Sequence, residues 1–220
     1  MRSVSQYKTL VFDCDGVVLN SNHVKTKAFY KATLPYGEKA ASTFVKYHTE
    51  NGGISRYKKF AHFLEEIAGN IKGPGLDELL ERYATEVVDG LLTCDVAEGL
   101  EKLRKQTPDS RWLIVSGGDQ DELRLVFEKR GLASLFDGGI FGSPTPKKDI
   151  LDRELETGNI QQPALFIGDS KYDHESAQYA GLDFVFVSSW SEVNNANKWL
   201  ESNCITSVLS TACLLDLNQE

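Results

Sequence analysis

The sequence predicts an α/β protein with a mostly parallel sheet, helices on both faces of that sheet, and an all-helical segment inserted after the first strand. Three observations indicate this fold class. Residues 9–12 are an apolar run that stops abruptly at two acids and a glycine, the pattern of a buried parallel strand. Residues 38–90 show only helical periodicity. From about residue 100 onward, strand and helix patterns alternate, as in parallel sheets with helices on both faces.

The helical segment follows the first strand directly. Helices are expected at residues 23–33, 40–48, 55–68 and 76–92, separated by turns rich in glycine, asparagine and proline. In the third of them, apolar residues recur at the spacing of one helix face: Phe60, Phe63, Leu64 and Ile67.

The rest of the chain is expected to alternate. Strands are predicted at 111–115, 139–141, 164–167 and 184–187, and helices at 100–105, 120–130, 148–156 and 172–180. The chain then ends with a helix near 193–200 and a weaker element over 205–217.

Length and charge bound the function classes. The 220 residues suffice for one sizeable domain and a small satellite, because a chain of this size buries roughly 70% of its unfolded surface. With 24 basic and 32 acidic residues, the formal net charge is −8, and the basic residues are scattered. A nucleic-acid partner bound through phosphate contacts is therefore not expected. An anionic small molecule bound through a metal ion remains compatible with this charge.

Apolar stretches and cysteines indicate the compartment. No stretch approaches about 18 consecutive apolar residues, and residues 1–6 lack the apolar segment of a signal peptide. Four cysteines occur without C-x-x-C spacing, which suggests neither a zinc site nor a disulfide framework: Cys14, Cys94, Cys204 and Cys213. We expect a soluble cytoplasmic protein without a membrane partner, either a monomer or a homodimer.

The first strand ends in the most informative residues. Asp13 and Asp15 flank Cys14, and Gly16 follows. In open α/β sheets the ligand lies outside the carboxyl ends of the strands, so both acids are expected to project into a site. A strand-end turn explains the same residues about equally well when they are considered alone.

Two later segments offer groups for binding an anion. Ser116 and Gly117 end the predicted strand at 111–115 and supply a hydroxyl and backbone N–H donors, although Ser116 equally suits a helix N-cap. Lys147 and Lys148 stand at a predicted helix start, where cations are unfavourable against the helix dipole. Such lysines usually lie in solvent, but a cation at this point could also offset an anion bound beside the acids.

The fourth strand end repeats the acidic pattern. Asp169 directly follows the apolar run at 164–167, and Asp173 lies one turn into the next helix, so both carboxylates can face one point. Acids at a helix N-terminus are common, which explains one of them more easily than both.

Taken together, these strand ends resemble the four motifs of the haloacid dehalogenase (HAD) superfamily, in the family's order. Phe12-Asp13-Cys14-Asp15-Gly16-Val17 is similar to the first motif, and the strand ending at Ser116 to the second. Gly142-Ser143-Pro144 followed by Lys147 resembles the third, so we favour Lys147 as the lysine that offsets a phosphate, with Lys148 as the alternate. Gly168-Asp169 followed by Asp173 resembles the fourth. One departure is Asn20, where many relatives carry Asp.

The resemblance implies a Rossmann-like core and a helical cap, as in the subgroup of phosphoglycolate phosphatases and β-phosphoglucomutases. The core would comprise residues 1–20 and 91–220, and the cap residues 21–90. It also implies Mg²⁺, held by the Asp13 carboxylate, the backbone carbonyl of Asp15, and Asp169, with Asp173 positioning the ion or its waters.

The family mechanism assigns a role to each remaining residue. Asp13 would attack phosphorus to give an aspartyl-phosphate, and Asp15 would protonate the leaving oxygen and then activate water. Ser116, Lys147 and the backbone N–H groups of Cys14 and Gly117 would hold the phosphoryl oxygens. Relatives that cleave carbon–halogen bonds lack the second acid, so dehalogenation is not expected.

Substrate choice is expected in the cap. Residues 51–56, Asn-Gly-Gly-Ile-Ser-Arg, resemble a cap loop in which the arginine meets a substrate anion. An exposed Arg56 next to Ser55 as helix N-cap explains this pattern about as well. Lys59 and His48 are weaker candidates for the same role.

These expectations favour a Mg²⁺-dependent phosphomonoester hydrolase acting on a small phosphorylated metabolite, such as a sugar phosphate or a phosphoglycolate-like acid. A sugar phosphomutase, which uses the same residues, is the alternative. A catalytically silent binding module is a third possibility that the complete set of acids disfavours.

Overall fold

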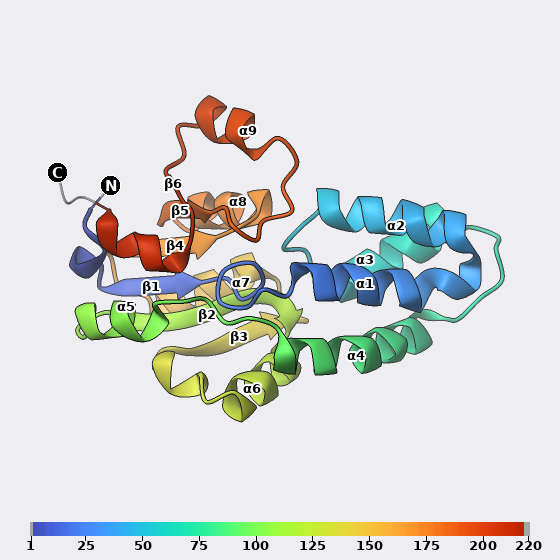
Figure 1. The fold of residues 1–220 in the computed structure, drawn as a ribbon, viewed down its shortest axis with the longest axis horizontal. Coiled ribbons are helices and arrows are strands. Elements are labelled where there is room, and N and C mark those ends of the chain that lie inside the picture. Colours follow the sequence, from blue (N-terminus) through green and yellow to red (C-terminus); the bar gives the residue numbers. More distant parts are fainter. Residues whose placement is uncertain (1, 218–220) are drawn as a thin grey trace.

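The computed structural model describes residues 2–217 and contains a six-stranded sheet in the order β3-β2-β1-β4-β5-β6 (Figure 1). All neighbouring strands are parallel, which confirms the predicted fold class. The strands are β1 (Thr9–Phe12), β2 (Arg111–Asp119), β3 (Gly139–Ser143), β4 (Ala164–Gly168), β5 (Asp183–Val187) and β6 (Ser207–Val208).

The central strands are continuous apolar runs because both faces of the sheet are covered. Leu10 and Phe12 belong to the larger apolar cluster, whereas Val11 between them belongs to the smaller one. Helices α5 (Leu100–Gln106) and α6 (Gln120–Lys129) contribute to the larger cluster. Helices α7 (Lys147–Glu156) and α8 (Lys171–Tyr179) contribute to the smaller one. The side chains of each strand thus alternate between two buried layers.

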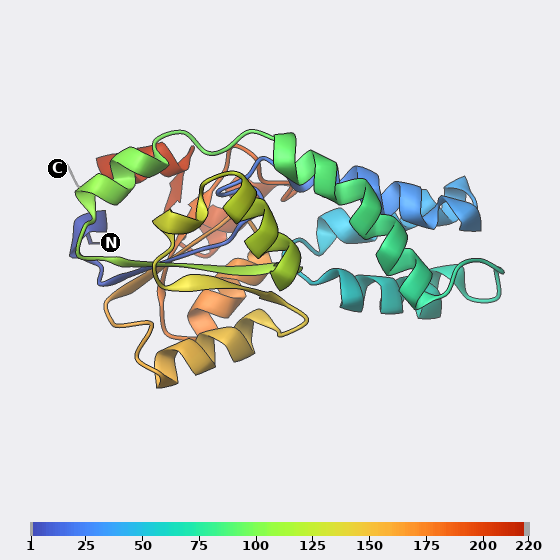
Figure 2. The same ribbon diagram turned by 90° about the horizontal axis from the view of Figure 1, so that it is seen from below.

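The inserted helices are α1 (Asn22–Thr33), α2 (Glu38–Glu50), α3 (Arg56–His62) and α4 (Leu76–Thr93). Figures 1 and 2 show them grouped beyond one end of the sheet, the end at which β1 leads into α1. Their shared core is aromatic: the ring of Phe29 lies 5.4 Å from that of Phe44, 5.2 Å from that of Phe60 and 4.3 Å from that of Tyr83, between centroids. We call these helices and their connections, residues 22–93, the helical insertion.

Three predicted elements differ in detail. The helix expected over 55–68 changes at Phe63 into a π-helix that ends at Ala68, a change that a pattern of apolar spacing does not reveal. The helix expected near 193–200 is α9 (Ala196–Ser202), because Asn195 takes a left-handed conformation with φ of 53°. The weak element at 205–217 contains strand β6 and a 3-10 helix, Thr211–Asp216.

In the described part of the chain, every helix is too short or too polar to cross a membrane.

Candidate active site

The acids at two strand ends meet in space. Asp13 follows β1, Asp169 follows β4, and Asp173 lies in the first turn of α8. One carboxylate oxygen from each lies within 4.8 Å of the others, and all three residues are buried. The backbone of Gly16 makes room for them: its φ is 74°, and a Cβ on this residue would come within 2.0 Å of Asp169 Oδ2.

Lys147 is the cation of this cluster. Its ammonium lies 3.0 Å from Asp13 Oδ1 and also contacts Asp173 Oδ1, and its side chain is only 1% exposed. Lys148 points elsewhere, with its ammonium 5.1 Å from the centroid of the Tyr179 ring on α8. The structure therefore brings Lys147, the lysine favoured from the sequence, to the acids.

Asp173 both caps helix α8 and contacts the cation of the cluster. Its Oδ2 accepts hydrogen bonds from the backbone N–H of Ser170 and from the Ser170 hydroxyl, at 3.1 and 2.6 Å, and forms a capping box for α8. Its Oδ1 faces Lys147. Because both oxygens are engaged, Asp173 suits the positioning role expected for it better than direct ligation of a metal ion.

The cluster carries more negative charge than Lys147 can offset. Burial, together with Asp173 and Asp15, raises the pKa of Asp13 to about 7 against the opposing effect of Lys147. Burial and the neighbouring acids also raise the pKa of Asp169 well above its usual range. Although Lys147 is close to Asp13 Oδ1, this oxygen accepts no hydrogen bond from residues 2–217. A hard divalent cation such as Mg²⁺ fits this site because it prefers oxygen ligands. Its positive charge would also lower the pKa of the carboxylates and so favour their ionised form.

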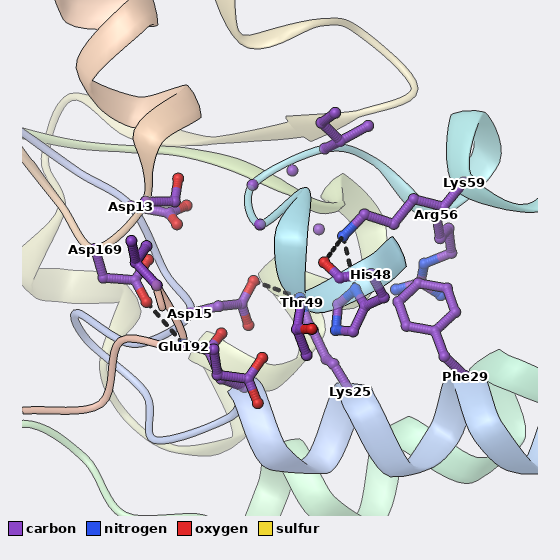
Figure 3. Close-up of a pocket in the computed structure, with 18 of the residues that line it drawn as sticks. Asp13, Asp15, Lys25, Phe29, His48, Thr49, Arg56, Lys59, Asp169 and Glu192 are labelled. Carbon is purple, nitrogen blue, oxygen red and sulfur yellow. Dashed lines mark hydrogen bonds and ion pairs between the residues drawn. The ribbon is translucent and has the colours of Figure 1, made fainter. Parts of the chain in front are cut away.

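Asp15 is held by the start of the helical insertion. Ser21 Oγ donates to Asp15 Oδ1 at 2.6 Å. The Lys25 ammonium lies 2.5 Å from Asp15 Oδ2 (Figure 3). Burial acts to raise the pKa of Asp15, but Lys25 and Ser21 hold it below its ordinary value. Asp15 is thus ionised at neutral pH in this arrangement, which is the form that accepts a proton.

Lys25 is a residue that the sequence analysis missed. It lies in the first turns of α1, and no motif marks it. Asn22, on the same helix, was also missed; its Nδ2 donates to Asp169 Oδ2 at 2.7 Å and to the carbonyl oxygen of Trp190 at 2.8 Å. The N-terminal end of α1 therefore connects the helical insertion to both acidic strand ends.

Replacing Lys25 with Met is expected to move the limb of the pH–activity profile that reports Asp15 upward by about 1–3 pH units, because the nearby cation no longer favours the carboxylate. Lys25→Arg keeps the charge and should move that limb far less. The measurement is phosphate release from p-nitrophenyl phosphate between pH 4 and pH 9 for the native chain and both variants. Identical profiles would show that Lys25 does not control Asp15.

Asn20 departs from the family pattern for a local reason. Its Nδ2 donates to Asp95 Oδ2 at 3.2 Å, across the two connections that join the helical insertion to the sheet. Its backbone N–H donates to the Asp95 carbonyl oxygen at 2.9 Å. An aspartate at this position would place two carboxylates against each other.

Ser116 and Gly117 lie at the end of β2, which runs on to Asp119 and so includes them. Ser116 is fully buried, and its Oγ accepts the backbone N–H of Gly118 at 3.0 Å. Ser116, Gly117 and Lys147 line a common hollow. A Cβ on Gly117 would come within 2.2 Å of the Gly53 carbonyl oxygen, so the loop of the helical insertion lies directly on this strand end.

Arg56 is buried. The explanation of its sequence pattern as an exposed arginine next to a helix N-cap is therefore wrong. Its side chain is 5% exposed and pairs with both carboxylate oxygens of Glu122 on α6, at 2.5 and 3.1 Å. Its guanidinium carbon lies 4.5 Å from the centroid of the Tyr83 ring. The residue lines the pocket beside the acids, but Glu122 already neutralises its charge.

Lys59 and His48 form the wall of the pocket opposite the acids. Figure 3 shows the Lys59 ammonium directed at His48, with Nζ 2.7 Å from Nδ1. Burial lowers the pKa of Lys59 to about 7, an effect to which the charge of Lys25 adds, whereas Asp15 and Glu192 act in the opposite direction. Burial and the same two lysines lower the pKa of His48 well below its usual range.

The lowered pKa of Lys59 predicts a pH dependence of stability. Between the usual pKa of 10.5 and the folded value of about 7, unfolding takes up a proton, so this residue's contribution to the free energy of unfolding falls as the pH falls, by about 1.4 kcal/mol per pH unit. Lys59→Met removes this dependence. Urea unfolding gives the free energy of unfolding of the variant minus that of the native chain, and this difference should be larger at pH 7 than at pH 9. An equal difference at the two pH values would contradict the prediction.

The comparisons with known proteins agree with this geometry. A family model for the haloacid dehalogenase-like hydrolases matches residues 10–187, and the chain belongs to this family. The family resemblance seen in the sequence is thereby confirmed. No curated protein matches the chain.

Solved structures share the fold along almost the whole chain. A candidate phosphoglycolate phosphatase from Lactobacillus plantarum is 22% identical, with 96% of this chain and 99% of that chain covered and a TM-score of 0.73. A β-phosphoglucomutase from Clostridium difficile is 18% identical, covering 96% and 93%, with a TM-score of 0.70. CbbY from Rhodobacter sphaeroides, solved with phosphate, is 17% identical, covering 96% and 100%, with a TM-score of 0.70. At these identities the likeness is one of fold.

Proposed function

We propose that this protein is a Mg²⁺-dependent phosphatase that hydrolyses small phosphomonoesters through an aspartyl-phosphate on Asp13. The observation that carries the proposal is the buried cluster of Asp13, Asp169 and Asp173 with Lys147 at the carboxyl edge of a parallel sheet. Membership of the hydrolase family and neighbours that include a candidate phosphatase and a phosphate complex support it.

The metal ion is proposed to be held by the carboxylates of Asp13 and Asp169 and by the backbone carbonyl of Asp15, with Asp173 orienting it. When bound, Mg²⁺ supplies positive charge that stabilises the phosphoryl oxygens and keeps the carboxylates ionised. Lys147 adds a fixed cation that contacts both Asp13 and Asp173. Ser116 and the backbone N–H of Gly117 are proposed to donate hydrogen bonds to the phosphoryl group.

In the first step, a carboxylate oxygen of Asp13 bonds to phosphorus and the bond from phosphorus to the ester oxygen breaks. The leaving oxygen takes a proton from Asp15. Because Lys25 and Ser21 favour the ionised form of Asp15, this step needs Asp15 to gain a proton before the ester oxygen leaves.

In the second step, Asp15 is ionised and takes a proton from water, which attacks phosphorus. The bond between phosphorus and Asp13 breaks, and inorganic phosphate is released with Asp13 restored. The same carboxyl group therefore acts as acid and then as base, and the arrangement with Lys25 favours the second of these roles.

A sugar phosphomutase is the second candidate, favoured by the fold shared with the β-phosphoglucomutase of Clostridium difficile. In that reaction the phosphoryl group of Asp13 passes to a sugar hydroxyl instead of water. Incubation with β-glucose 1-phosphate and a trace of the 1,6-bisphosphate separates the two. A phosphatase releases inorganic phosphate, whereas a mutase accumulates glucose 6-phosphate with little free phosphate.

We also propose that residues 21–90 act as a cap domain on a core of residues 1–20 and 91–220. Loop residues Gly52 and Gly53 lie against Ser170 and Gly117 of the sheet edge, so opening of the cap would admit substrate and closing would exclude water. A cytoplasmic location is part of the proposal, supported by four free cysteines, a state that a reducing compartment maintains.

A further inference from the structure

The pocket beside the acids has a second, basic side that belongs to the helical insertion. Lys59 on α3 and His48 on α2 line the same pocket as Asp13 and Asp15. Figure 3 shows the carboxylates and the Lys59–His48 pair on different sides of this space. The side chain of neither residue takes part in the phosphoryl-transfer chemistry proposed above.

Lys59 differs from the other buried cations of the site. Each of the others is paired with a carboxylate: Lys25 with Asp15, Lys147 with Asp13 and Asp173, and Arg56 with Glu122. Lys59 has no carboxylate within 4.0 Å among residues 2–217, although it is only 1% exposed. Its hydrogen-bond partners are Nδ1 and the carbonyl oxygen of His48, at 2.7 and 3.4 Å. A buried ammonium without a countercharge is costly unless something else supplies one.

His48 presents a second unsatisfied group. Its Nε2 is buried and has no hydrogen-bond partner within the described residues. When the Lys59 ammonium donates to Nδ1, the proton of the neutral imidazole lies on Nε2, which then becomes a donor. The pair therefore offers N–H donors for which the described residues supply no acceptor. Unused donors of this kind are suited to binding an anion.

Glu192 also lines this pocket, and Figure 3 shows it beside Asp15. Its two carboxylate oxygens accept from the Thr26 hydroxyl, at 3.1 and 3.2 Å, and burial raises its pKa. It forms no ion pair with Lys59 at 4.0 Å or less in the described part of the chain. Glu192 therefore leaves the ammonium available to a ligand.

We infer that Lys59 and His48 bind a second anionic group of the substrate, at the end away from the transferred phosphoryl group. The inference rests on the proposed phosphatase function and specifies its substrate class: small phosphomonoesters that also carry a carboxylate or a second phosphate. It assigns to Lys59 and His48 the recognition that the sequence pattern attributed to Arg56, whose charge Glu122 neutralises.

The test compares esters that differ only in the second anion. 2-Phosphoglycolate is paired with 2-hydroxyethyl phosphate, and propane-1,3-diol bisphosphate with 3-hydroxypropyl phosphate. In Lys59→Met, KM for the doubly anionic member is expected to rise by about 10- to 100-fold, the effect of losing hydrogen bonds to a charged group. KM for the member that lacks the second anionic group and kcat for both are expected to change little. The pair that shows the effect distinguishes a carboxylate from a second phosphate.

Lys46→Met is the matched control, because Lys46 lies on α2 like His48 but its side chain is 78% exposed. This variant is expected to keep the native KM for all of these esters. His48→Gln provides a second test if Lys59→Met does not fold, with the same selective rise in KM. Equal rises in KM for the two members of a pair, or no rise, would overturn the inference.

Binding separates failure of this inference from failure of the proposed function. If the native chain hydrolyses none of the esters, the phosphatase proposal fails, and thermal unfolding with Mg²⁺ then decides the inference. A rise in Tm with 2-phosphoglycolate or the bisphosphate, absent with the partner esters that lack the second anion and absent in Lys59→Met, supports the anion site. A native chain that none of the esters stabilises would overturn it.

Discussion

Asp13→Asn is expected to release phosphate from p-nitrophenyl phosphate on the order of 10⁴ times more slowly than the native chain, because an amide cannot form the acyl phosphate. The substitution keeps the shape of the side chain. It also removes a negative charge from a buried cluster in which the pKa of Asp13 is raised to about 7. Because Lys147 keeps Asp173 as a partner and ionised Asp13 is disfavoured in the folded chain, the variant should be at least as stable as the native chain in metal-free buffer at pH 8.

Asp109→Asn is the matched control for this variant, because Asp109 is exposed in a turn preceding β2. Phosphate release and thermal unfolding are measured on all three chains. A folded Asp13→Asn protein that retains a near-native rate would exclude Asp13 as the nucleophile.

Lys147→Met is expected to have the second largest effect. The change leaves Asp13 and Asp173 without the buried cation that contacts both, and removing one partner of a buried ion pair costs about 3–5 kcal/mol. Protonation of the carboxylates relieves this cost, so the loss in the free energy of unfolding should be larger at pH 8 than at pH 5. Phosphate release should also fall, because one donor to the phosphoryl group is missing.

The control is Lys148→Met, which changes the adjacent residue, whose ammonium lies over the Tyr179 ring instead. It is expected to leave phosphate release close to the native rate and the pH dependence of stability unchanged. Urea unfolding in the presence of chelator gives the free energies. Equal effects of the two substitutions would contradict the position of Lys147 in the site.

The parts of the site that the sequence predicted share a physical origin. Asp13 and Asp169 each follow a buried apolar strand, and parallel strands end at one edge of a sheet, so local patterns determine that they meet. Asp173 follows from the helix that begins beside Asp169. The fold class was predictable for the same reason, because the apolar runs of strands and the periodicity of helices are both local properties of the chain.

The parts that were not predicted depend on how the helical insertion packs on the sheet. Lys25 meets Asp15, and Arg56 meets Glu122, through contacts between segments that no local pattern relates. The burial of Lys59 against His48 likewise arises from packing between α2 and α3. Helix periodicity indicates which face of a helix is apolar, but it does not indicate which partner a charged side chain will find.

The most direct test of the account is phosphate release by the native chain from a panel of sugar phosphates, nucleotides and phosphorylated acids, with Mg²⁺ and with excess chelator. We expect inorganic phosphate from at least one phosphomonoester with Mg²⁺, loss of that release with chelator, and recovery when Mg²⁺ is restored. Release that persists undiminished in chelator would contradict the role of the acidic cluster as a metal site. Absence of release from every ester in the presence of Mg²⁺ would contradict the phosphatase itself.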